Sequence, residues 1–373
     1  MKLGKEIYII FLSVFFFVSS KEVWAWQAQE NFDEPLKIGL IISDSTAVEA
    51  SNGAKLAVKL VNENGGINGR PVQLITRSME GAWGSGSKEV VDLVFKENVW
   101  AILGSHDSRN AHLVEQVIAK TRVVFLSAWA SDPTLSQAYV PWYFSAVPND
   151  YQQAKVLVKE IYDLRKIEKA IAILDDSYDS KMAWKSMSRE ISIAGKVVPK
   201  TFFLDGTDKN YSNLISEIKS NKTAALILMG RPYEAWELID QIRQQSINNL
   251  VFGNISILGE GVFSKRRLQD YNGVVLIGSE KWLENKPSSF RNQYVAVYGH
   301  IPGAAAAFAF DGMTVLLKAL EISNLDREKM KEAMMKTQAK GCTGNLRFNE
   351  RGLLKDNPEL IEIKEGNLVL LEH

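Results

Sequence analysis

The sequence predicts an α/β fold built from doubly wound parallel sheets, and three observations lead to this class. Short runs that are almost continuously apolar recur along the chain, as expected of parallel strands buried on both faces. Segments with apolar residues at helical spacing separate these runs. Small polar residues follow the runs, at the strand ends where ligands bind in such sheets. Strands that alternate with helices at this spacing predict a parallel, doubly wound sheet.

A first set of these units precedes about residue 146. Its strands are expected at 37–42, 72–76, 99–103 and 123–126, with helices over about 50–64 and 110–120. Gly65 and Gly66 then end the first helix in the manner of a C-terminal cap. The glycine-rich loop 81–88 lacks the Gly-Lys-Ser/Thr ending of a phosphate loop. We therefore interpret it as a flexible loop in which Ser85 or Ser87 caps the next helix.

A second set of units follows, and the pattern then changes after Gly278. Strands are expected at 170–174, 197–204, 224–229, 250–253 and 274–277, with helices over about 150–164, 181–193, 211–219 and up to 244. Beyond them we expect helices over 287–298, 303–322 and 326–337, a turn at 350–352 and two short strands that end at Leu371. No low-complexity linker separates the two sets, so strand-like crossings are expected to join them.

Composition excludes several classes of function. The 373 residues include 44 Lys and Arg and 44 Asp and Glu, so no basic field is present to hold nucleic acid. The single cysteine, Cys342, rules out intrachain disulfides and cysteine-rich metal sites. None of the four histidines has a partner at metal-ligand helical spacing. The sequence therefore predicts neither a metal nor a cofactor.

The N-terminus predicts export. Lys2 and Lys5 precede an apolar run over 7–18, and small residues follow near Ala25. The run is too short for a comfortable membrane span, so residues 1–25 are interpreted as a cleaved secretory signal, with an uncleaved anchor as the alternative. No cysteine follows for a lipid anchor. The mature chain is expected to begin near Trp26 and to reside in the periplasm.

The segment 99–133 contains two neighbouring strands that each end in a serine-rich turn before a helix. Such turns offer hydroxyls, free N–H groups and the positive end of a helix dipole to an anion. Two of them together could hold a small carboxylate. The alternative, which the residues alone favour, is that Ser108 and Ser131 only cap helices.

These residues resemble the type I periplasmic solute-binding proteins, in particular the branched-chain amino acid (leucine/isoleucine/valine) binding family of ABC importers. The resemblance covers almost the whole mature chain, with its motifs in the same order. The segments that carry it are 53–70, 102–104 with Ser108, 127–133, 147–153, 175–178 and 343–348.

The resemblance implies two α/β lobes joined by a three-segment hinge, with the ligand between them. The first lobe would hold residues 35–146 and 279–354, and the second would hold 147–278 and 355–373.

Carried over by position, the resemblance also implies ligand contacts. Ser108 and Ser131 fall where the family holds the ligand's α-carboxylate, and the backbone around Trp129 falls near its ammonium. Tyr178 falls where a tyrosine covers the ligand on closure, and Glu260 falls where an acidic side chain pairs with the α-ammonium. Tyr178 packed at the rim and an exposed Glu260 are the plainer alternatives.

Three positions depart from the family pattern. Thr46 stands where the family often has an aromatic side chain, and Trp129 is bulky at a place that is usually small. Arg231 lies near a position where the family prefers an aromatic contact. An inward Arg231 would suit a ligand with a second negative group, whereas an outward one would be an ordinary surface arginine.

The resemblance implies the substrate-binding component of an ABC importer. Such a protein, expected to be a monomer, binds an amino acid or related small carboxylate by hinge closure and presents it to a membrane permease. A sensor of the same fold that acts through a membrane partner is the alternative. An enzyme is disfavoured, because the sequence contains no G-x-S-x-G elbow, no paired Cys and His motif and no metal constellation.

Overall fold

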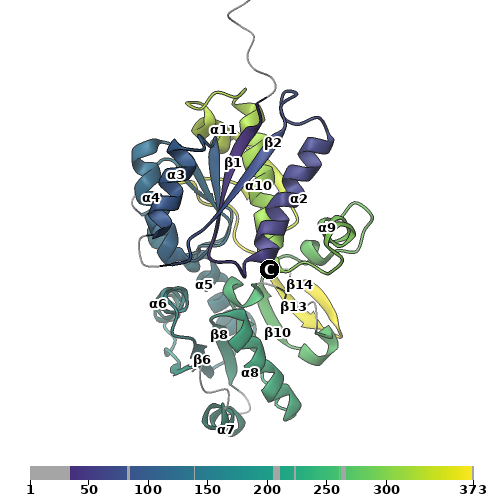
Figure 1. The fold of residues 1–373 in the computed structure, drawn as a ribbon. Helices are drawn as coiled ribbons and strands as arrows, with labels where there is room; N and C mark the ends of the chain where they lie inside the picture. The colour runs from purple at the N-terminus through teal and green to yellow at the C-terminus, as the bar shows by residue number, and fades with distance from the viewer. Residues whose placement is uncertain are drawn as a thin grey trace, which may run out of the picture.

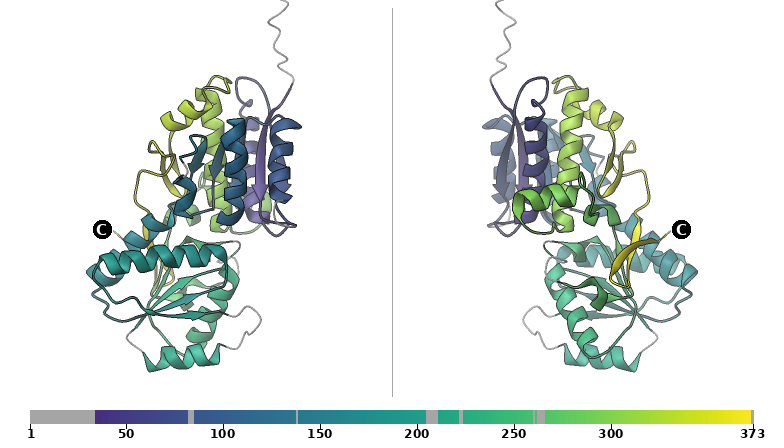
Figure 2. Two further views of the ribbon diagram at one scale, coloured as in Figure 1. Left: turned by 90° about the vertical axis from the view of Figure 1, so that its left-hand side faces the viewer. Right: turned by 90° about the vertical axis from the view of Figure 1, so that its right-hand side faces the viewer.

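Two α/β lobes lie one above the other in the computed structural model, each built around its own sheet (Figure 1, Figure 2). The structure describes residues 34–81, 85–137, 139–204, 211–221, 224–259, 261 and 266–371. The predicted signal segment 1–25 therefore lies outside the described residues. No helix in the described part of the chain has the length and apolar character needed to cross a membrane.

The upper lobe contains a parallel five-stranded sheet with the order β2-β1-β3-β4-β5. Its strands are β1 (Leu36–Ile42), β2 (Val72–Ser78), β3 (Ala101–Ser105), β4 (Val124–Ser127) and β5 (Tyr143–Ser145). Its helices are α2 (Val48–Glu63), α3 (Ser85–Phe95), α4 (Ser108–Thr121), α10 (Ala304–Ile322) and α11 (Met330–Lys336), with the 3₁₀ turn η1 (Pro133–Ser136). The strand order reverses between β1 and β3, which is where ligands bind in doubly wound sheets.

The lower lobe contains a seven-stranded sheet with the order β14-β13-β10-β9-β8-β6-β7. Its strands are β6 (Ala170–Leu174), β7 (Lys200–Phe203), β8 (Ala225–Met229), β9 (Val251–Gly253), β10 (Val274–Ile277), β13 (Leu360–Lys364) and β14 (Asn367–Leu371). Its helices are α5 (Asp150–Val158), α6 (Tyr178–Ile193), α7 (Ser212–Ser220) and α8 (Pro232–Gln244), with the short turns η3 (Ile255–Leu258) and η4 (Leu268–Tyr271). The order reverses between β6 and β8. Strand β13 pairs antiparallel with β10, and β14 pairs antiparallel with β13.

The chain passes between the two sheets three times, at 146–149, from 278 onward and at 348–359, as the predicted three-segment hinge requires. Hydrogen bonds join the residues on either side of the first crossing to the third crossing. The Ser145 N–H donates to the Gly352 carbonyl at 2.8 Å, and the Gln152 amide donates to the Leu354 carbonyl at 3.0 Å. The turn η5 (Glu280–Leu283) and helix α9 (Phe290–Tyr298) follow the second crossing, and the hairpin β11 (Gln338–Gly341) and β12 (Gly344–Arg347) precedes the third.

Helices α2 and α10 form the closest helix pair in the upper lobe. Gly53 of α2 faces the backbone of α10 so closely that a Cβ there would lie 2.0 Å from the Ala306 carbonyl oxygen. Small residues at the start of α10, Ala304 to Ala307, are all buried. The predicted helices over 50–64 and 303–322 are confirmed as α2 and α10, and the structure adds that they pack against each other.

Some predicted elements differ from those observed. The helix predicted over 150–164 is α-helical only to Val158 and continues as a π-helical segment, η2 (Lys159–Leu164), in which the Arg165 N–H bonds the Glu160 carbonyl at 3.0 Å. The strand predicted over 197–204 shortens to β7, because pairing with β6 begins at Ile171 opposite Lys200, and residues 197–199 precede that pair. Helix α3 begins at Ser85, so Ser87 lies within its first turn, and residues 82–84 lie outside the described part.

Candidate functional site

A cavity of about 1320 Å³ lies between the two lobes, where the carboxyl ends of strands from both sheets meet. Ser43 and His106, which follow β1 and β3 in the sequence, line it from the upper lobe. Ser177 and Gly230, which follow β6 and β8, line it from the lower lobe. Both switch points therefore open into the same space, which also extends along α8. Aromatic side chains such as Trp129 and Trp236 line the cavity together with many polar and charged groups. A concave space of this size between two domains is typical of small-molecule sites.

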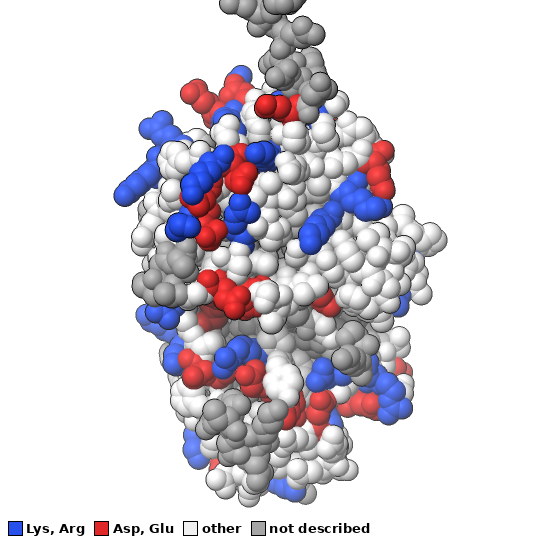
Figure 3. All heavy atoms as spheres, viewed as in Figure 1, with Lys and Arg blue, Asp and Glu red and all other residues white. Residues whose placement is uncertain are grey.

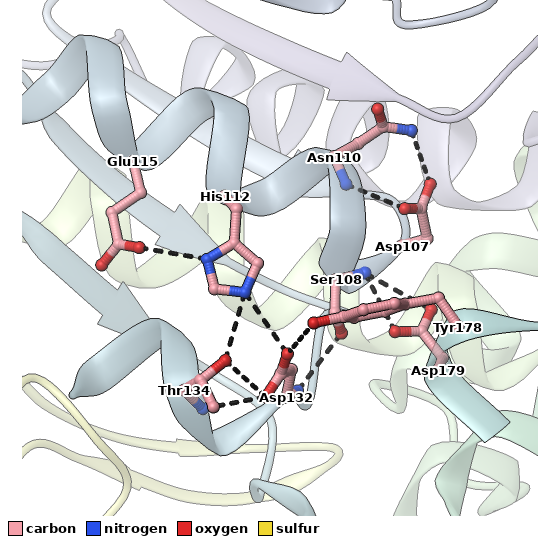
Figure 4. A network of polar contacts seen from close by, with 9 residues as sticks. All are labelled: Asp107, Ser108, Asn110, His112, Glu115, Asp132, Thr134, Tyr178 and Asp179. Carbon is pink, nitrogen blue, oxygen red and sulfur yellow. Dashed lines mark hydrogen bonds and ion pairs between the residues drawn. The ribbon is translucent and has the colours of Figure 1, made fainter. Parts of the chain in front are cut away.

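Ser108 bonds across the cleft to Asp179 (Figure 4). Its backbone N–H, at the start of α4, donates to Asp179 Oδ1 at 3.1 Å and to Oδ2 at 3.3 Å. The Ser108 hydroxyl accepts from the Asp132 N–H at 3.2 Å and so ties the two serine turns together. The cap of α4 is Asp107, which accepts from the Asn110 N–H at 2.9 Å. The capping alternative is therefore wrong for Ser108.

Asp179 lies against other acidic groups. Burial is the main cause that raises the pKa of the Asp179 carboxyl to about 6; bonds from Ser108 oppose the rise, and the charges of Asp107 and Asp132 add to it. Asp179 is the first-turn acid of α6 and lines the cavity. Sequence reasoning missed it, because its partner lies in the other lobe, 71 residues away.

Ser131 also bonds to a carboxylate of the protein. Its hydroxyl donates to Asp150 Oδ1 at 2.8 Å, and its carbonyl accepts from the Asp150 N–H at 2.8 Å. Asp132, not Ser131, caps the turn η1, so the capping alternative is wrong here too. Burial raises the pKa of the Asp150 carboxyl well above its ordinary value.

Tyr178 joins the lobes at the edge of the cleft (Figure 4). Its hydroxyl donates to Asp132 Oδ2 at 2.8 Å, and its side chain is 39% exposed. The same Oδ2 lies 3.3 Å from His112 Nε2, whose other nitrogen is 3.5 Å from Glu115. The hydrogen bonds to Asp132 and then Glu115 raise the pKa of His112 to about 9. Burial would raise the pKa of Asp132, but bonds from His112, Thr134 and Tyr178 lower it overall.

Trp129, Thr46 and Arg231 line the cavity. Trp129 packs edge-on against Phe308, with ring centroids 6.1 Å apart. Thr46 is exposed, and its N–H donates to Asp44 Oδ1 at 2.7 Å.

Arg231 faces the carboxylates of its own lobe. Its guanidinium lies 3.3 Å from Asp175, 2.9 Å from Asp176 and 3.4 Å from Glu234. The side chain is 53% exposed. The guanidinium at this position is therefore already shared among three acids.

Glu260 lies outside the described residues. An acid that the sequence did not single out, Glu49 of α2, lies beside that segment. Its Oε2 accepts from the Gly303 N–H at 2.7 Å and from the Gly261 N–H of the lower lobe at 3.0 Å. Burial raises the pKa of Glu49, and these two backbone bonds oppose the rise.

His106 is a second residue that sequence reasoning passed over. It is 2% exposed, it lines the cavity, and neither ring nitrogen has a partner at hydrogen-bonding geometry among the described residues. Burial lowers the pKa of His106 to about 4, and the charge of Asp107 and the Ile41 backbone only partly offset that effect. The imidazole is therefore neutral at pH 7 and offers one donor and one acceptor.

Two lobes around an interlobe cavity, each with its switch point at that cavity, define a protein that binds a small molecule between its domains. Residues 35–366 match the family described as periplasmic binding protein, and the chain belongs to that family.

The chain is also similar to curated proteins and to solved structures. A leucine-, isoleucine-, valine-, threonine- and alanine-binding protein of Pseudomonas aeruginosa is 24% identical over 82% of each chain. The branched-chain amino acid transporter substrate-binding protein of Streptococcus pneumoniae, solved with isoleucine, superposes with a TM-score of 0.77 at 20% identity, covering 91% of this chain and 100% of that one. An ABC transporter solute-binding protein of Rhodopseudomonas palustris, solved with 3,4-dihydroxybenzoic acid, gives a TM-score of 0.78 at 16% identity over 90% and 96%. The fold is thus that of type I periplasmic binding proteins.

Proposed function

We propose that this chain is the periplasmic substrate-binding component of an ABC importer, which closes its lobes over an amino acid or a related small molecule. The observation that carries the proposal is the cavity at the joint switch points of both sheets. Three contacts span it: Tyr178 to Asp132, Ser108 to Asp179 and Gly261 to Glu49. Such contacts between lobes suit a receptor that works by hinge closure.

The relatives support the ligand's general class. Those named above bind branched-chain and other small amino acids or an aromatic acid, according to their names. The proposed receptor is secreted by its signal segment, acts as a monomer, delivers its ligand to a membrane permease and performs no turnover. Trp129 and His106 would contact the ligand in the cleft, because both line it.

Thermal unfolding of the protein from Trp26 onward tests this function. A compound that binds only the folded state must raise the midpoint as its concentration rises above its dissociation constant. We expect at least one compound among amino acids, amides, dicarboxylates and aromatic acids to do so, and to be recovered unchanged by mass spectrometry. No shift with any of these compounds would overturn the proposal.

A matched pair of tryptophan variants locates the site. Trp129→Ala should weaken binding of the active compound about tenfold or more, because it removes a large apolar wall of the cleft. Trp100→Ala is the control, since Trp100 precedes β3 at the opposite end of the sheet and packs under Arg327 at 4.4 Å. Equal loss in both variants would place the binding site elsewhere.

A further inference from the structure

We propose that Asp179 sets the chemical class of the ligand: the end of the ligand that faces α4 is an N–H donor, an amide or an ammonium, rather than a carboxylate. This inference rests on the proposed function, since it concerns the ligand of the same cleft. It reverses the polarity expected from the two serine turns.

Both turns that could receive a carboxylate already hold one from the protein. The Ser108 N–H donates a hydrogen bond to Asp179, and the Ser131 hydroxyl donates one to Asp150. Ser108 is fully buried and Ser131 is 8% exposed, so neither group has solvent to exchange for a ligand. In the closed arrangement a ligand carboxylate would have to displace Asp179 from Ser108 or Asp150 from Ser131.

The neighbouring charges also oppose an anion. Asp107 and Asp132 face Asp179 from α4 and η1, and Asp150 faces it from the start of α5. Among the described residues that bond to these acids, the cation is His112, which already pairs with Asp132 and Glu115. Figure 3 shows a group of acidic atoms at the waist between the lobes. Like charges at this range repel, and the repulsion is strong where water is excluded.

Two of the arginines that line the described part of the cavity, Arg231 and Arg266, are paired with acids of the protein. Arg231 is shared among three acids of its own lobe, and Arg266 pairs with Asp240 at 3.0 Å. Arg243 donates to the carbonyls of Ile247 and Asn249 at 2.6 and 3.1 Å. Arg243 has no carboxylate partner among the described residues, and its buried Nε has no hydrogen-bond partner. It lies in the last turn of α8, in the lower lobe, so it could meet only an end of the ligand other than the one that faces α4.

A donor group fits the same place. A carboxylate such as Asp179 can accept further hydrogen bonds beyond those from Ser108, and a donor from the ligand would offset the cost of its burial. The neutral ring of His106, which is buried and unpartnered at the cavity wall, adds a donor and an acceptor nearby. An amide end of a ligand could use both residues, whereas a carboxylate end would gain from neither resident acid.

Carboxylate and carboxamide forms of the same molecules test the inference directly. We would measure the binding of leucine against leucinamide and of benzoate against benzamide at neutral pH by calorimetry and thermal shift. The carboxamide of at least one pair should bind about tenfold more tightly, which corresponds to about 1.4 kcal/mol. This preference should shrink in the wild type near pH 5, because a protonated Asp179 can itself donate to a carboxylate.

Asp179→Asn should abolish the preference or reverse it, because the uncharged amide removes the repulsion and offers a donor. Asp163→Asn is the control, since Asp163 is exposed at the end of the π-helical segment in the same lobe and carries the same charge change. The wild-type pH series gives the same answer if the Asp179 variant fails to fold.

The inference fails if the wild type binds the carboxylates as tightly as the carboxamides, a result that leaves the proposed function intact. Absence of binding with the whole compound panel would instead overturn the proposed function, and the inference with it.

Discussion

At the scale of a single side chain, His112 links two buried carboxylates, Asp132 and Glu115, beside the cleft. Their hydrogen bonds raise its pKa from 6.5 to about 9. A histidine whose folded pKa is raised stabilises the protein fully below its unfolded pKa, and this stability is lost as the pH rises through the folded value. We expect the free energy of unfolding to fall by about 1–2 kcal/mol between those two pH values, after discounting for the exposed part of the ring.

Urea unfolding across that interval checks the expectation in the wild type and in His112→Gln. His112→Gln should have a lower free energy of unfolding than the wild type at the lower pH. Its free energy of unfolding should not fall as the pH rises through the folded pKa of His112. Parallel curves for the two proteins would mean that other groups set the alkaline decline.

Asp179 predicts the opposite kind of pH dependence at lower pH. Its folded pKa is raised from 3.8 to about 6, so the folded state holds the proton more tightly than the unfolded state does. The stability contributed by this group therefore falls as the pH rises through that window. At neutral pH, Asp179→Asn should raise the free energy of unfolding by about 1–3 kcal/mol, and Asp163→Asn should change it by less than about 0.5 kcal/mol. Urea unfolding at neutral pH and near pH 4 separates these cases, and a less stable Asp179→Asn at neutral pH would contradict the assignment.

Among the polar residues near the cleft, the sequence predicted some and left others unidentified. It placed Ser108 and Ser131 in two adjoining turns, because serine after a buried strand is a local pattern. It could not find Asp179 or Glu49 as their counterparts at the cleft, because each bonds to a group that only the approach of the lobes brings near. Long-range pairing of polar groups leaves no periodicity to detect.

At the scale of elements, Gly53 decides how closely α2 and α10 approach. In an exposed helix, glycine to alanine would add about 1 kcal/mol of stability from helix propensity. Here the added Cβ would meet the Ala306 carbonyl oxygen at 2.0 Å, and that oxygen belongs to helix backbone that cannot step aside alone. We therefore expect Gly53→Ala to lower the free energy of unfolding by about 2–3 kcal/mol, because overpacking outweighs propensity.

Thermal and urea unfolding of Gly53→Ala measures this effect, with Lys55→Ala on the exposed face of the same helix as the control. The control should change stability little. A stabilised Gly53→Ala would show that the two helices separate without cost.

The elements that sequence reasoning found are those with a local signature. The buried strands β1, β3, β6 and β8 are continuous apolar runs, and their predicted positions are confirmed. The π-helical end of the 150–164 helix contains no proline or glycine, so the sequence has no local signal for the change from α-helix. Strand β5 was not predicted, because its three residues gain strand geometry only by pairing with β4.

At the scale of the whole molecule, the arrangement of the lobes depends on contacts much weaker than the two cores. The crossings bond to the chain beside them, while Tyr178, Asp179 and Glu49 each bond across the cleft. Each such bond contributes about 0.5–1.5 kcal/mol, so the closed arrangement can be shifted without unfolding either lobe. The chain segments of each lobe were implied by resemblance and remain a prediction, although the pairing of β13 with β10 is consistent with them.

Tyr178→Phe isolates one of these contacts, because it removes the hydroxyl that donates to Asp132 at 2.8 Å and keeps the ring. Loss of that bond should shift the closed-to-open ratio about two- to tenfold toward the open form. Small-angle X-ray scattering without ligand should then give a larger radius of gyration, while thermal unfolding changes little, since the hydroxyl belongs to neither core. Tyr139→Phe, at an exposed tyrosine of the upper lobe, should leave both quantities unchanged. An unaltered radius of gyration in Tyr178→Phe would mean that Asp179 and Glu49 suffice to hold the lobes together. The double variant with Asp179→Ala, which removes the acceptor for the Ser108 N–H, would then be the one to open the cleft.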